Sequence, residues 1–476
     1  MKKIMQKFLL LMCSLAFLKA NAHTGKTFLL PQPMVVAQQP DLLDTIFCTR
    51  CHGMHKSDSA SITFFGREAL NHQQLGGYFG VAEKNVMQIN SVADASQTDL
   101  YYRQIVHDCD GNSSDQRITM NILPYHESIG CLLHQHVFLT KRWYCTYTLP
   151  FVQVDNHVRV SYENVFNRRE VYLQNLKNFF VGNIINEVVA DRNLQSPLQF
   201  AKIDNKRHTS SGLSDAAVAI GYQWQVKNDC MCAIQVSLLI PLSNKPTAEF
   251  LFEPMRGNGK HVGLGVVLQS FGRVIGDEHW QLHFLLQASG QYLVQNTQKR
   301  TLGLKDLNWA HYYLLGKESR EVNQPLVPAA NILTQDIISY PGWNYQGMGE
   351  IIFHAAPCFL GLGYQVYVQD HEYLKLKNTF SENHYAFAQA DFETNEFFAG
   401  TDDQMLHSLG RCNWIMEKDI DKDGAQQQSV NTHTLFLHGG FAFKKIMSDI
   451  GIAYTYTREN SALESLSGWL RASYIF

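Results

Sequence analysis

Apolar residues recur at every second position in several stretches of the chain. Over 279–293, one set of alternate positions is apolar and the other is small or polar. The apolar set holds Trp280, Leu282, Phe284, Leu286, Ala288 and Tyr292, and the other set holds Gln281, His283, Gln287, Ser289 and Gln291. The stretches 216–226, 233–242 and 450–457 alternate in the same way. This period predicts β-strands, because a helix repeats its apolar positions about every 3.6 residues.

The connections between these stretches alternate between short and long. Short links fall near 140–142, 227–231, 272–278, 357–358 and 444–448, and long links near 83–128, 154–213, 243–260, 294–348, 370–430 and 459–467. Transmembrane β-barrels combine apolar-out strands with short periplasmic turns and longer external loops. The sequence therefore predicts an all-β fold, an antiparallel transmembrane β-barrel of about twelve strands with both termini on the periplasmic side. We expect the strands at 70–82, 129–139, 143–153, 214–226, 232–242, 261–271, 279–293, 349–356, 359–369, 431–443, 449–458 and 468–476.

The ends of the chain and its composition agree with export into a membrane. Lys2, Lys3 and Lys7 precede an apolar run that is too short to span a bilayer, and Ala20-Asn21-Ala22 fits a cleavage site. We therefore expect a signal peptide over 1–22, an extended periplasmic segment over 23–69 and the barrel over 70–476. Charged residues make up only 17% of the chain, and the net charge of −3 gives no reason to expect nucleic-acid binding.

One long connection departs from the strand pattern. Within 162–180, Val165, Tyr172, Leu176 and Phe179 follow helical spacing with charged residues between them. This spacing predicts an amphipathic helix in an external loop.

The last residues, Gly468 to Phe476, alternate strictly and end on an aromatic residue. This segment resembles the closing strand of bacterial outer-membrane β-barrels, which the barrel-assembly machinery recognises. Three turn segments also resemble uncharacterised exported barrel proteins of intracellular bacteria: Gly25 to Phe28, Ser211 to Asp215 before Gly221-Tyr222, and Phe252 to His261. The segment Gly212-Leu213-Ser214-Asp215, which leads into a strand, is similar to a segment of barrels proposed to take up hydrophobic compounds. The resemblance implies an outer-membrane location and contact with membrane lipid.

If the apolar faces point toward lipid, the inward faces are rich in glutamine, and charge on them is sparse. The residues expected to line the lumen are Gln223, Gln225, Gln235, Gln281, His283, Gln287 and Arg471. A neutral, hydrogen-bonding lumen favours a porin-like channel for passive passage of small polar solutes, with no catalytic residue. A closed barrel in which the glutamines bond one another, and a non-conducting surface barrel whose loops bind a partner, stay open as alternatives.

Three short motifs suggest other chemistry. Cys48, Cys51 and His52 have the spacing of a c-type haem attachment site. Asp419, Asp421 and Asp423 occupy alternate positions as in a calcium loop, although Val430 stands where a bidentate Glu belongs. We expect no cofactor: the cysteines form a small disulfide loop or are unused, and the aspartates lie in a solvated acidic loop, with haem and calcium left as alternatives.

The third motif is His208-Thr-Ser210-Ser-Gly212, which resembles the catalytic motif of outer-membrane phospholipases but has Ser211 where that family has Asn. We expect it in a loop before the strand at 214–226, with no lipid-hydrolase activity.

The chain contains ten cysteines. Removal of the signal peptide, which contains Cys13, leaves an odd number, so at least one thiol is expected to be free or paired elsewhere. We do not expect Cys230 to pair with Cys232.

Overall fold

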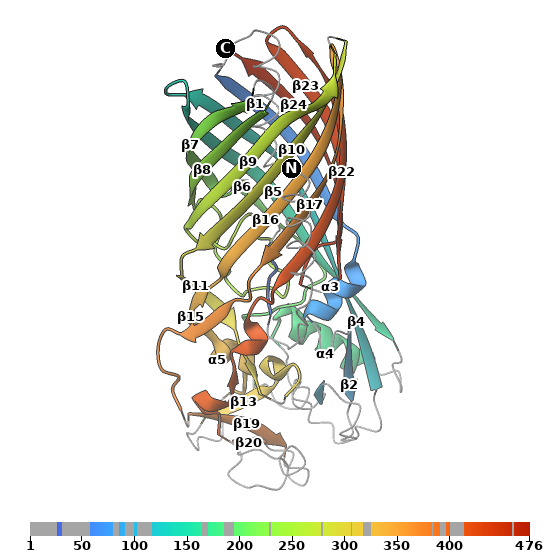
Figure 1. Ribbon diagram of the computed structural model, residues 1–476. Helices are drawn as coiled ribbons and strands as arrows, with labels where there is room; N and C mark the ends of the chain where they lie inside the picture. Colours follow the sequence, from blue (N-terminus) through green and yellow to red (C-terminus); the bar gives the residue numbers. More distant parts are fainter. Residues whose placement is uncertain are drawn as a thin grey trace.

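The computed structural model forms a closed barrel with a folded domain at one end (Figure 1). It describes residues 26–30, 58–79, 85–90, 100–101, 117–163, 170–184, 195–227, 230–277, 279–305, 307–317, 325–382, 384–390, 397–399, 414–458 and 461–476. The predicted all-β, antiparallel, twelve-stranded barrel is confirmed. Its strands are β1 Ser59–Ala69, β4 Arg117–Phe138, β5 Trp143–Glu163, β7 Ala216–Lys227, β8 Cys230–Ile240, β9 Gly263–Gly276, β10 Trp280–Leu293, β16 Gly342–Ala355, β17 Cys358–Gln369, β22 Val430–Phe443, β23 Ile446–Thr457 and β24 Ser465–Ile475.

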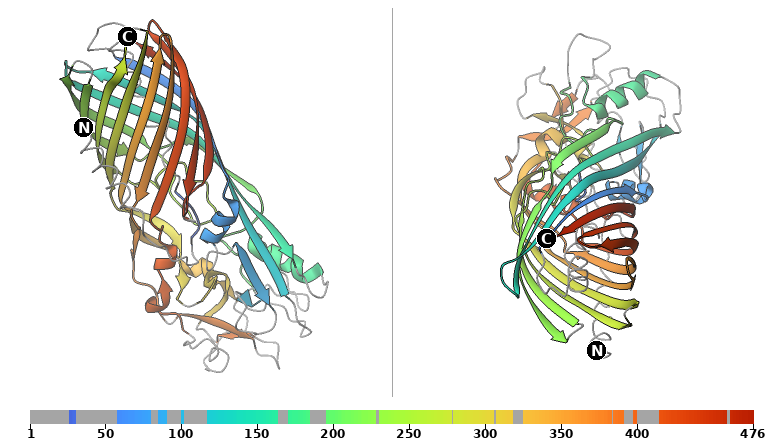
Figure 2. Two further views of the ribbon diagram at one scale, coloured as in Figure 1. Left: turned by 45° about the vertical axis from the view of Figure 1, so that its right-hand side comes forward. Right: turned by 90° about the horizontal axis from the view of Figure 1, so that it is seen from above.

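Each barrel strand pairs with its neighbours along the chain in antiparallel register. The ring closes where β1 pairs on one side with β4 and on the other with β24, so that Gly66 lies opposite Gly468. β5 pairs with β7 near its start and with the short strand β6, Arg207–Leu213, further along. Figure 2 shows the ring from above, with the terminal strand beside the first.

The first barrel strand lies earlier than predicted. The strand expected over 70–82 is wrong, because that stretch forms helix α3, His72–Phe79. Leu75, Tyr78 and Phe79 are buried at helical spacing and pack in the core of the domain at the end of the barrel. The barrel therefore begins at Ser59, while the strand expected at 349–356 begins earlier, at Gly342.

The outer surface of the barrel carries the apolar faces. Along β10, Trp280 and Tyr292 mark the two ends of an outward apolar row, and Gln281, His283 and Gln287 alternate with it as buried inward positions. At the two ends Trp280 stacks on Phe353, and Tyr292 contacts Trp343. Such aromatic girdles bound the apolar belt of transmembrane barrels. The barrel is therefore built for an apolar surround.

Aromatic residues near the strand ends divide between the two faces. Trp143, Trp224 and Tyr474 are outward, with 39–48% of each side chain exposed. Trp469 is inward and 5% exposed, so it is not part of the outer girdle. It faces inward because it lies opposite Gly451 of β23 and Phe65 of β1, both of which are inward.

The long connections fold into a domain at the end of the barrel opposite the C terminus (Figure 1). Its helices are α3, α4 Glu170–Val181, α5 Ala329–Leu333, η3 Ala310–Tyr312, η4 Glu417–Asp419 and η5 Asp423–Ala425. Its strands are β2 Val86–Asn90, β3 Leu100–Tyr101, β11 Asn296–Thr301, β12 Gly303–Leu304, β13 Leu314–Lys317, β14 Val327–Pro328, β15 Thr334–Tyr340, β18 Tyr373–Leu376, β19 Tyr385–Ala390, β20 Phe397–Ala399 and β21 Ile420–Asp421. We call these connections the loop domain. The segment Lys26–Leu30 also lies there, where Phe28 bridges to Glu253.

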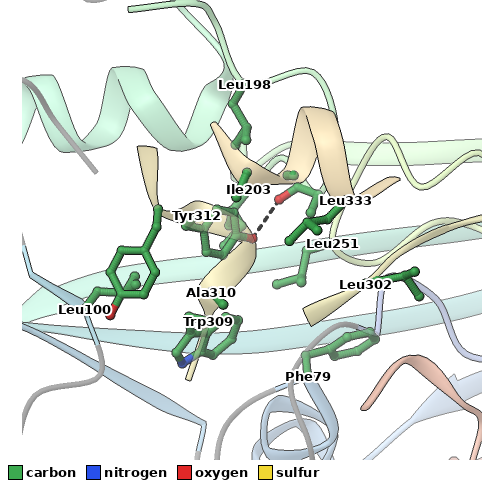
Figure 3. Close-up of a cluster of buried hydrophobic side chains, with 14 of the residues drawn as sticks. Phe79, Leu100, Leu198, Ile203, Leu251, Leu302, Trp309, Ala310, Tyr312 and Leu333 are labelled. Carbon is green, nitrogen blue, oxygen red and sulfur yellow. Dashed lines mark hydrogen bonds between the residues drawn. The ribbon is translucent and has the colours of Figure 1, made fainter. Parts of the chain in front are cut away.

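The loop domain has its own hydrophobic core (Figure 3). The predicted loop helix is confirmed as α4, which buries Leu176, Phe179 and Phe180. Tyr312 packs on both phenylalanine rings and donates a hydrogen bond of 2.7 Å to the carbonyl of Ala201. The loops are therefore held together by packing as well as by their attachment to the strands.

Within the described part of the chain, no helix has the length and apolar character needed to cross a bilayer.

Candidate functional site in the barrel interior

The residues expected to line the lumen occupy inward positions on four strands. Gln235, Gln281, His283, Gln287 and Arg471 are each 9% exposed or less. Gln223 is half-buried and Gln225 is exposed, near the end of the barrel that carries the short turns. Whether these side chains line a path for a solute stays a prediction.

The glutamines of the inner wall are hydrogen-bonded to neighbours. Gln235 donates to the hydroxyl of Tyr144 at 2.9 Å, and Gln269 donates to Gln287 at 3.3 Å. Gln281 donates to the backbone carbonyl of Asp277 at 3.1 Å. This agrees with the alternative in which inward glutamines bond to groups of the barrel.

A chain of four ionisable side chains crosses the interior near its middle. Glu350 of β16, His438 of β22, Asp449 of β23 and Arg471 of β24 form it, and each side chain is at most 1% exposed. Glu350 Oε1 lies 2.5 Å from His438 Nε2, and His438 Nδ1 lies 3.6 Å from Asp449 Oδ2. Asp449 Oδ2 also accepts a hydrogen bond from Arg471 Nη2. We call these four residues the central ion chain.

The central ion chain depends on a glycine in the strand between β16 and β22. At Gly361 of β17, an added Cβ would lie 2.2 Å from His438 Nε2 and 2.5 Å from Glu350 Oε1. No side chain larger than hydrogen fits there, so Glu350 and His438 meet across β17.

Apolar side chains surround the central ion chain. The buried inward cluster, on the same strands and on β1, β4, β5 and β10, consists of Phe65, Leu132, Val152, Val154, Leu285, Met348, Phe436, Ala453 and Trp469, each 8% exposed or less. The rings of Phe359, Phe436 and Trp469 lie within 6.4 Å of the His438 ring. In this low-polarity surround the charges interact more strongly than in water, and an unpaired charge would be costly.

The expectation of a neutral, glutamine-lined interior with sparse charge is therefore wrong at this level. Glu350, His438 and Asp449 were missed because each looks ordinary on its own strand. Only the register of five paired strands, β16, β17, β22, β23 and β24, brings them together with Arg471. An ionisable residue at an inward strand position is the one sequence feature that points to them.

The interior is occluded at the level of the apolar cluster. A wide aqueous pore leaves the side chains of its wall accessible to water. Here Leu285, Met348 and Phe436 are at most 1% exposed, and His438 and Arg471 are at most 2% exposed. The structure is therefore that of a barrel without a continuous open lumen at this level.

The residues of the hydrolase-like motif are not arranged for catalysis. The motif lies on strand β6 and not in a loop, so that expectation is wrong. His208 Nε2 is 2.8 Å from Asp204 Oδ1, and its ring stacks on Phe250 with centroids 3.8 Å apart. No hydrogen bond joins His208 to Ser210. His208 is thus engaged with Asp204 and Phe250.

The three aspartates of the calcium-like loop are used in local hydrogen bonds. Asp419 accepts from the amide of Met416, and Asp421 accepts from the amide of Gly424. Asp423 Oδ1 accepts from Gln426 Nε2. Among the residues with assigned positions there is no group of three His, Cys, Asp or Glu side chains that could hold a metal ion.

Cys48, Cys51 and His52 lie outside the described residues, as does the expected signal peptide. Among the cysteines that the structure describes, Cys131, Cys145, Cys232 and Cys358 are free thiols, so no disulfide joins Cys230 to Cys232.

A second buried polar cluster, in the loop domain, was not found from the sequence. His261 Nδ1 donates to the carbonyl of Val294 at 2.8 Å, and Gln298 Nε2 donates to His261 Nε2 at 2.9 Å. The ring is therefore in its neutral form, and burial lowers the pKa of His261 to about 4. Glu372 lies beside it, where it accepts a 2.7 Å hydrogen bond from Arg300.

Ser339 belongs to the same cluster and gives it an outward likeness to a hydrolase triad. Its hydroxyl is 3.4 Å from His261 Nε2, but it donates its hydrogen bond to Glu372. Ser339 is fully buried, so no substrate reaches it. The hydrogen bonds of this cluster join β11, β15 and the loop before β9.

The geometry defines the chain as a closed, antiparallel, twelve-stranded β-barrel with an apolar outer face. No protein-family model matches the sequence. No curated protein matches it either. The resemblance to exported barrels of intracellular bacteria therefore stays a prediction.

Several solved outer-membrane barrels can be superposed loosely on the structure. An outer-membrane channel from Pseudomonas putida F1 has a TM-score of 0.37 and 10% identity, covering 88% of this chain and 96% of its own. The translocator domain of the autotransporter NalP from Neisseria meningitidis has a TM-score of 0.32 and 8% identity, covering 92% and 95%. OprB of Pseudomonas putida has a TM-score of 0.23 and 6% identity, covering 91% and 98%. Superposition at this level assigns no function to the chain.

Proposed function

We propose that the protein is an outer-membrane channel for small polar solutes that is closed at rest. The observation that carries the proposal is the layering of the inner wall. Polar side chains lie on both sides of the apolar cluster, with Gln281 toward the short turns and Gln287 toward the loop domain. Such an interior would admit polar solutes at both mouths and block them at its middle.

Opening would require the apolar cluster and the central ion chain to rearrange. The Phe436 and Trp469 rings lie close to His438, with centroids 6.4 and 6.3 Å away. Truncation of these two rings removes the bulk that fills the middle while leaving the four ionisable side chains in place. The barrel wall itself is held by continuous strand pairing and does not depend on either ring.

The test is single-channel recording on the purified protein in planar bilayers. We expect the wild-type protein to conduct rarely and the double variant Phe436→Ala with Trp469→Ala to conduct in discrete steps. A matched control is Trp280→Ala with Phe353→Ala, which removes a stacked pair of rings from the outer surface. Silence of the inner double variant, with its folding confirmed by heat-dependent gel mobility, would refute the channel.

A non-conducting surface barrel is the second candidate. It is favoured by the extent of the loop domain, whose hydrophobic core includes residues from helices and strands far apart in the chain, among them Phe79, Phe180 and Tyr312. In that case the barrel is a membrane anchor and the loop domain binds the partner. A lack of conductance by the double variant Phe436→Ala with Trp469→Ala would favour this second function. For either function we propose assembly by the barrel-assembly machinery, an outer-membrane location and no catalysis.

A further inference from the structure

A groove runs over the outer surface of the barrel where the first and last strands meet. It has a volume of about 700 Å³ and is lined from β1, β4, β17, β22, β23 and β24. That volume is in the range of small-molecule binding sites. The groove lies within the apolar outer face, outside the barrel interior.

Glycines on adjacent strands form the floor of the groove. Gly66 of β1 lies directly opposite Gly468 of β24, and both belong to the outward alternation of their strands. In the same row of the sheet, Gly66 pairs with Ile129 on one side and Gly468 pairs with Ile452 on the other. Two neighbouring positions without side chains thus lie between two isoleucines.

The floor glycines are not required by packing. A Cβ added at Gly66 would meet nothing closer than 3.8 Å, and one added at Gly468 nothing closer than 3.6 Å. These distances are ordinary van der Waals contacts. The glycines therefore leave open space on the membrane face that the barrel itself does not use.

The walls of the groove are strongly apolar and exposed. Leu360, Leu437, Ile450, Ile452 and Leu466 are between 43% and 66% exposed. An acyl chain seated between them would contact apolar atoms on both sides and below, and gain more contact than on the flat outer wall.

One end of the groove is acidic. Glu68 and Glu127 lie opposite each other on β1 and β4 and both line the groove. Arg207 is 3.4 Å from Glu127, whereas Glu68 has no ion pair or hydrogen bond with any residue that the structure describes. Two like charges directly opposite in a sheet destabilise it, and Arg207 supplies a cation to Glu127, so Glu68 is the member of the pair that calls for a further cation.

We propose that the groove binds a membrane lipid whose head carries an ammonium group. The acyl chain lies over Gly66 and Gly468, and the ammonium pairs with Glu68 and Glu127 at the end nearer the loop domain. The acidic end disfavours an anionic head, and the apolar walls disfavour a ligand without a tail. The site is separate from the barrel interior and does not depend on the channel proposal.

The test uses the full-length protein in nanodiscs made of equal amounts of phosphatidylethanolamine and phosphatidylglycerol. Lipids retained by the protein are counted by native mass spectrometry after release from the disc. For the wild type we expect about fivefold enrichment of phosphatidylethanolamine, the size of effect that an exposed ion pair gives. Retention at the bulk ratio would overturn the assignment of the head group.

Groove-filling variants test the site itself. Gly468→Leu fills the floor and is expected to abolish lipid retention, while Gly468→Ala adds a single carbon and is expected to weaken it. The matched control is Gly349→Leu, an outward glycine on β16 where a Cβ would lie 3.5 Å from Leu286. Glu68→Gln is expected to keep a retained lipid and lose the preference for its head. Equal retention by Gly468→Leu, Gly349→Leu and the wild type would refute the groove as a binding site.

Discussion

The central ion chain makes a sharp prediction about the stability of the barrel. Asp449→Asn preserves the size of the side chain and removes its charge. Asp449 Oδ2 accepts from Arg471 Nη2 and lies 3.6 Å from His438 Nδ1, and both side chains of the Asp449–Arg471 pair are at most 1% exposed. The substitution therefore leaves the guanidinium buried without a countercharge.

The expected cost follows from that burial. Removing one partner of a buried ion pair destabilises a protein by about 3–5 kcal/mol, because the remaining charge has lost its solvent and its partner. Total stabilities are only about 5–15 kcal/mol, so a loss of this size is readily measured. Replacement of both residues, Asp449→Asn with Arg471→Met, removes the buried charge as well. The double variant is expected to recover much of the loss, because a buried pair and an apolar substitute are often of similar stability.

The assay is equilibrium unfolding in urea of the protein inserted in phospholipid vesicles, followed by tryptophan fluorescence. A double-mutant cycle over Asp449 and Arg471 then yields their coupling energy. Asp277→Asn, in the exposed turn between β9 and β10, is the control and is expected to leave the unfolding midpoint unchanged. A cost below about 1 kcal/mol for Asp449→Asn, together with zero coupling, would show that the pair is solvated and that the interior is wet.

Three further predictions concern the wall, the loop domain and the interior packing. Ile351→Arg places a charge at an outward position that is 57% exposed. It is expected to lower the free energy of unfolding in vesicles by about 2–4 kcal/mol. An unchanged free energy would contradict a lipid-facing surface. In the loop domain, burial lowers the pKa of His261 to about 4 and that of His311 to about 3. Below pH 6.5 the unfolded state therefore binds more protons than the folded state. The stability of the loop domain is expected to fall as pH drops from 6.5 toward 4. Hydrogen exchange should detect that loss of stability. His261→Gln should reduce the slope of loop-domain stability against pH by about 1.4 kcal/mol per pH unit. Gly451→Ala places a Cβ 2.1 Å from the Trp469 ring, so it is expected to shift the tryptophan emission and lower the urea midpoint, and an unchanged spectrum would contradict the packing.

The fold could be predicted from the sequence because its main determinant is local. Alternation along a single strand decides which side chains face outward, and eleven of the twelve strands were found where the pattern predicted them. The first strand was missed because its outward row is broken by Gly66 and ends on Glu68. An interrupted apolar row looks like a loop, and here the interruption forms the outer groove.

The interior could not be predicted in the same way, because its contacts join side chains of different strands. Glu350 meets His438 across β17, and Asp449 meets Arg471 on the adjacent strand β24. Register across several strands fixes these contacts, and a single-residue slip would turn any one of these side chains toward lipid. Periodicity along one strand carries no information about the register of the others.

Small inward residues illustrate why the packing of the interior could not be predicted strand by strand. Gly363 and Gly451 look like empty places on the inner wall when each strand is considered alone. In the structure a Cβ at Gly363 would lie 2.1 Å from the Phe436 ring, and a Cβ at Gly451 would lie 2.1 Å from the Trp469 ring. At each glycine, an aromatic ring of the adjacent strand occupies the space that a side chain would take. Glycine on the inner face therefore allows the interior to be filled more densely. The width of such an interior is set by the sum of neighbouring side-chain volumes, and strand number alone overestimates it.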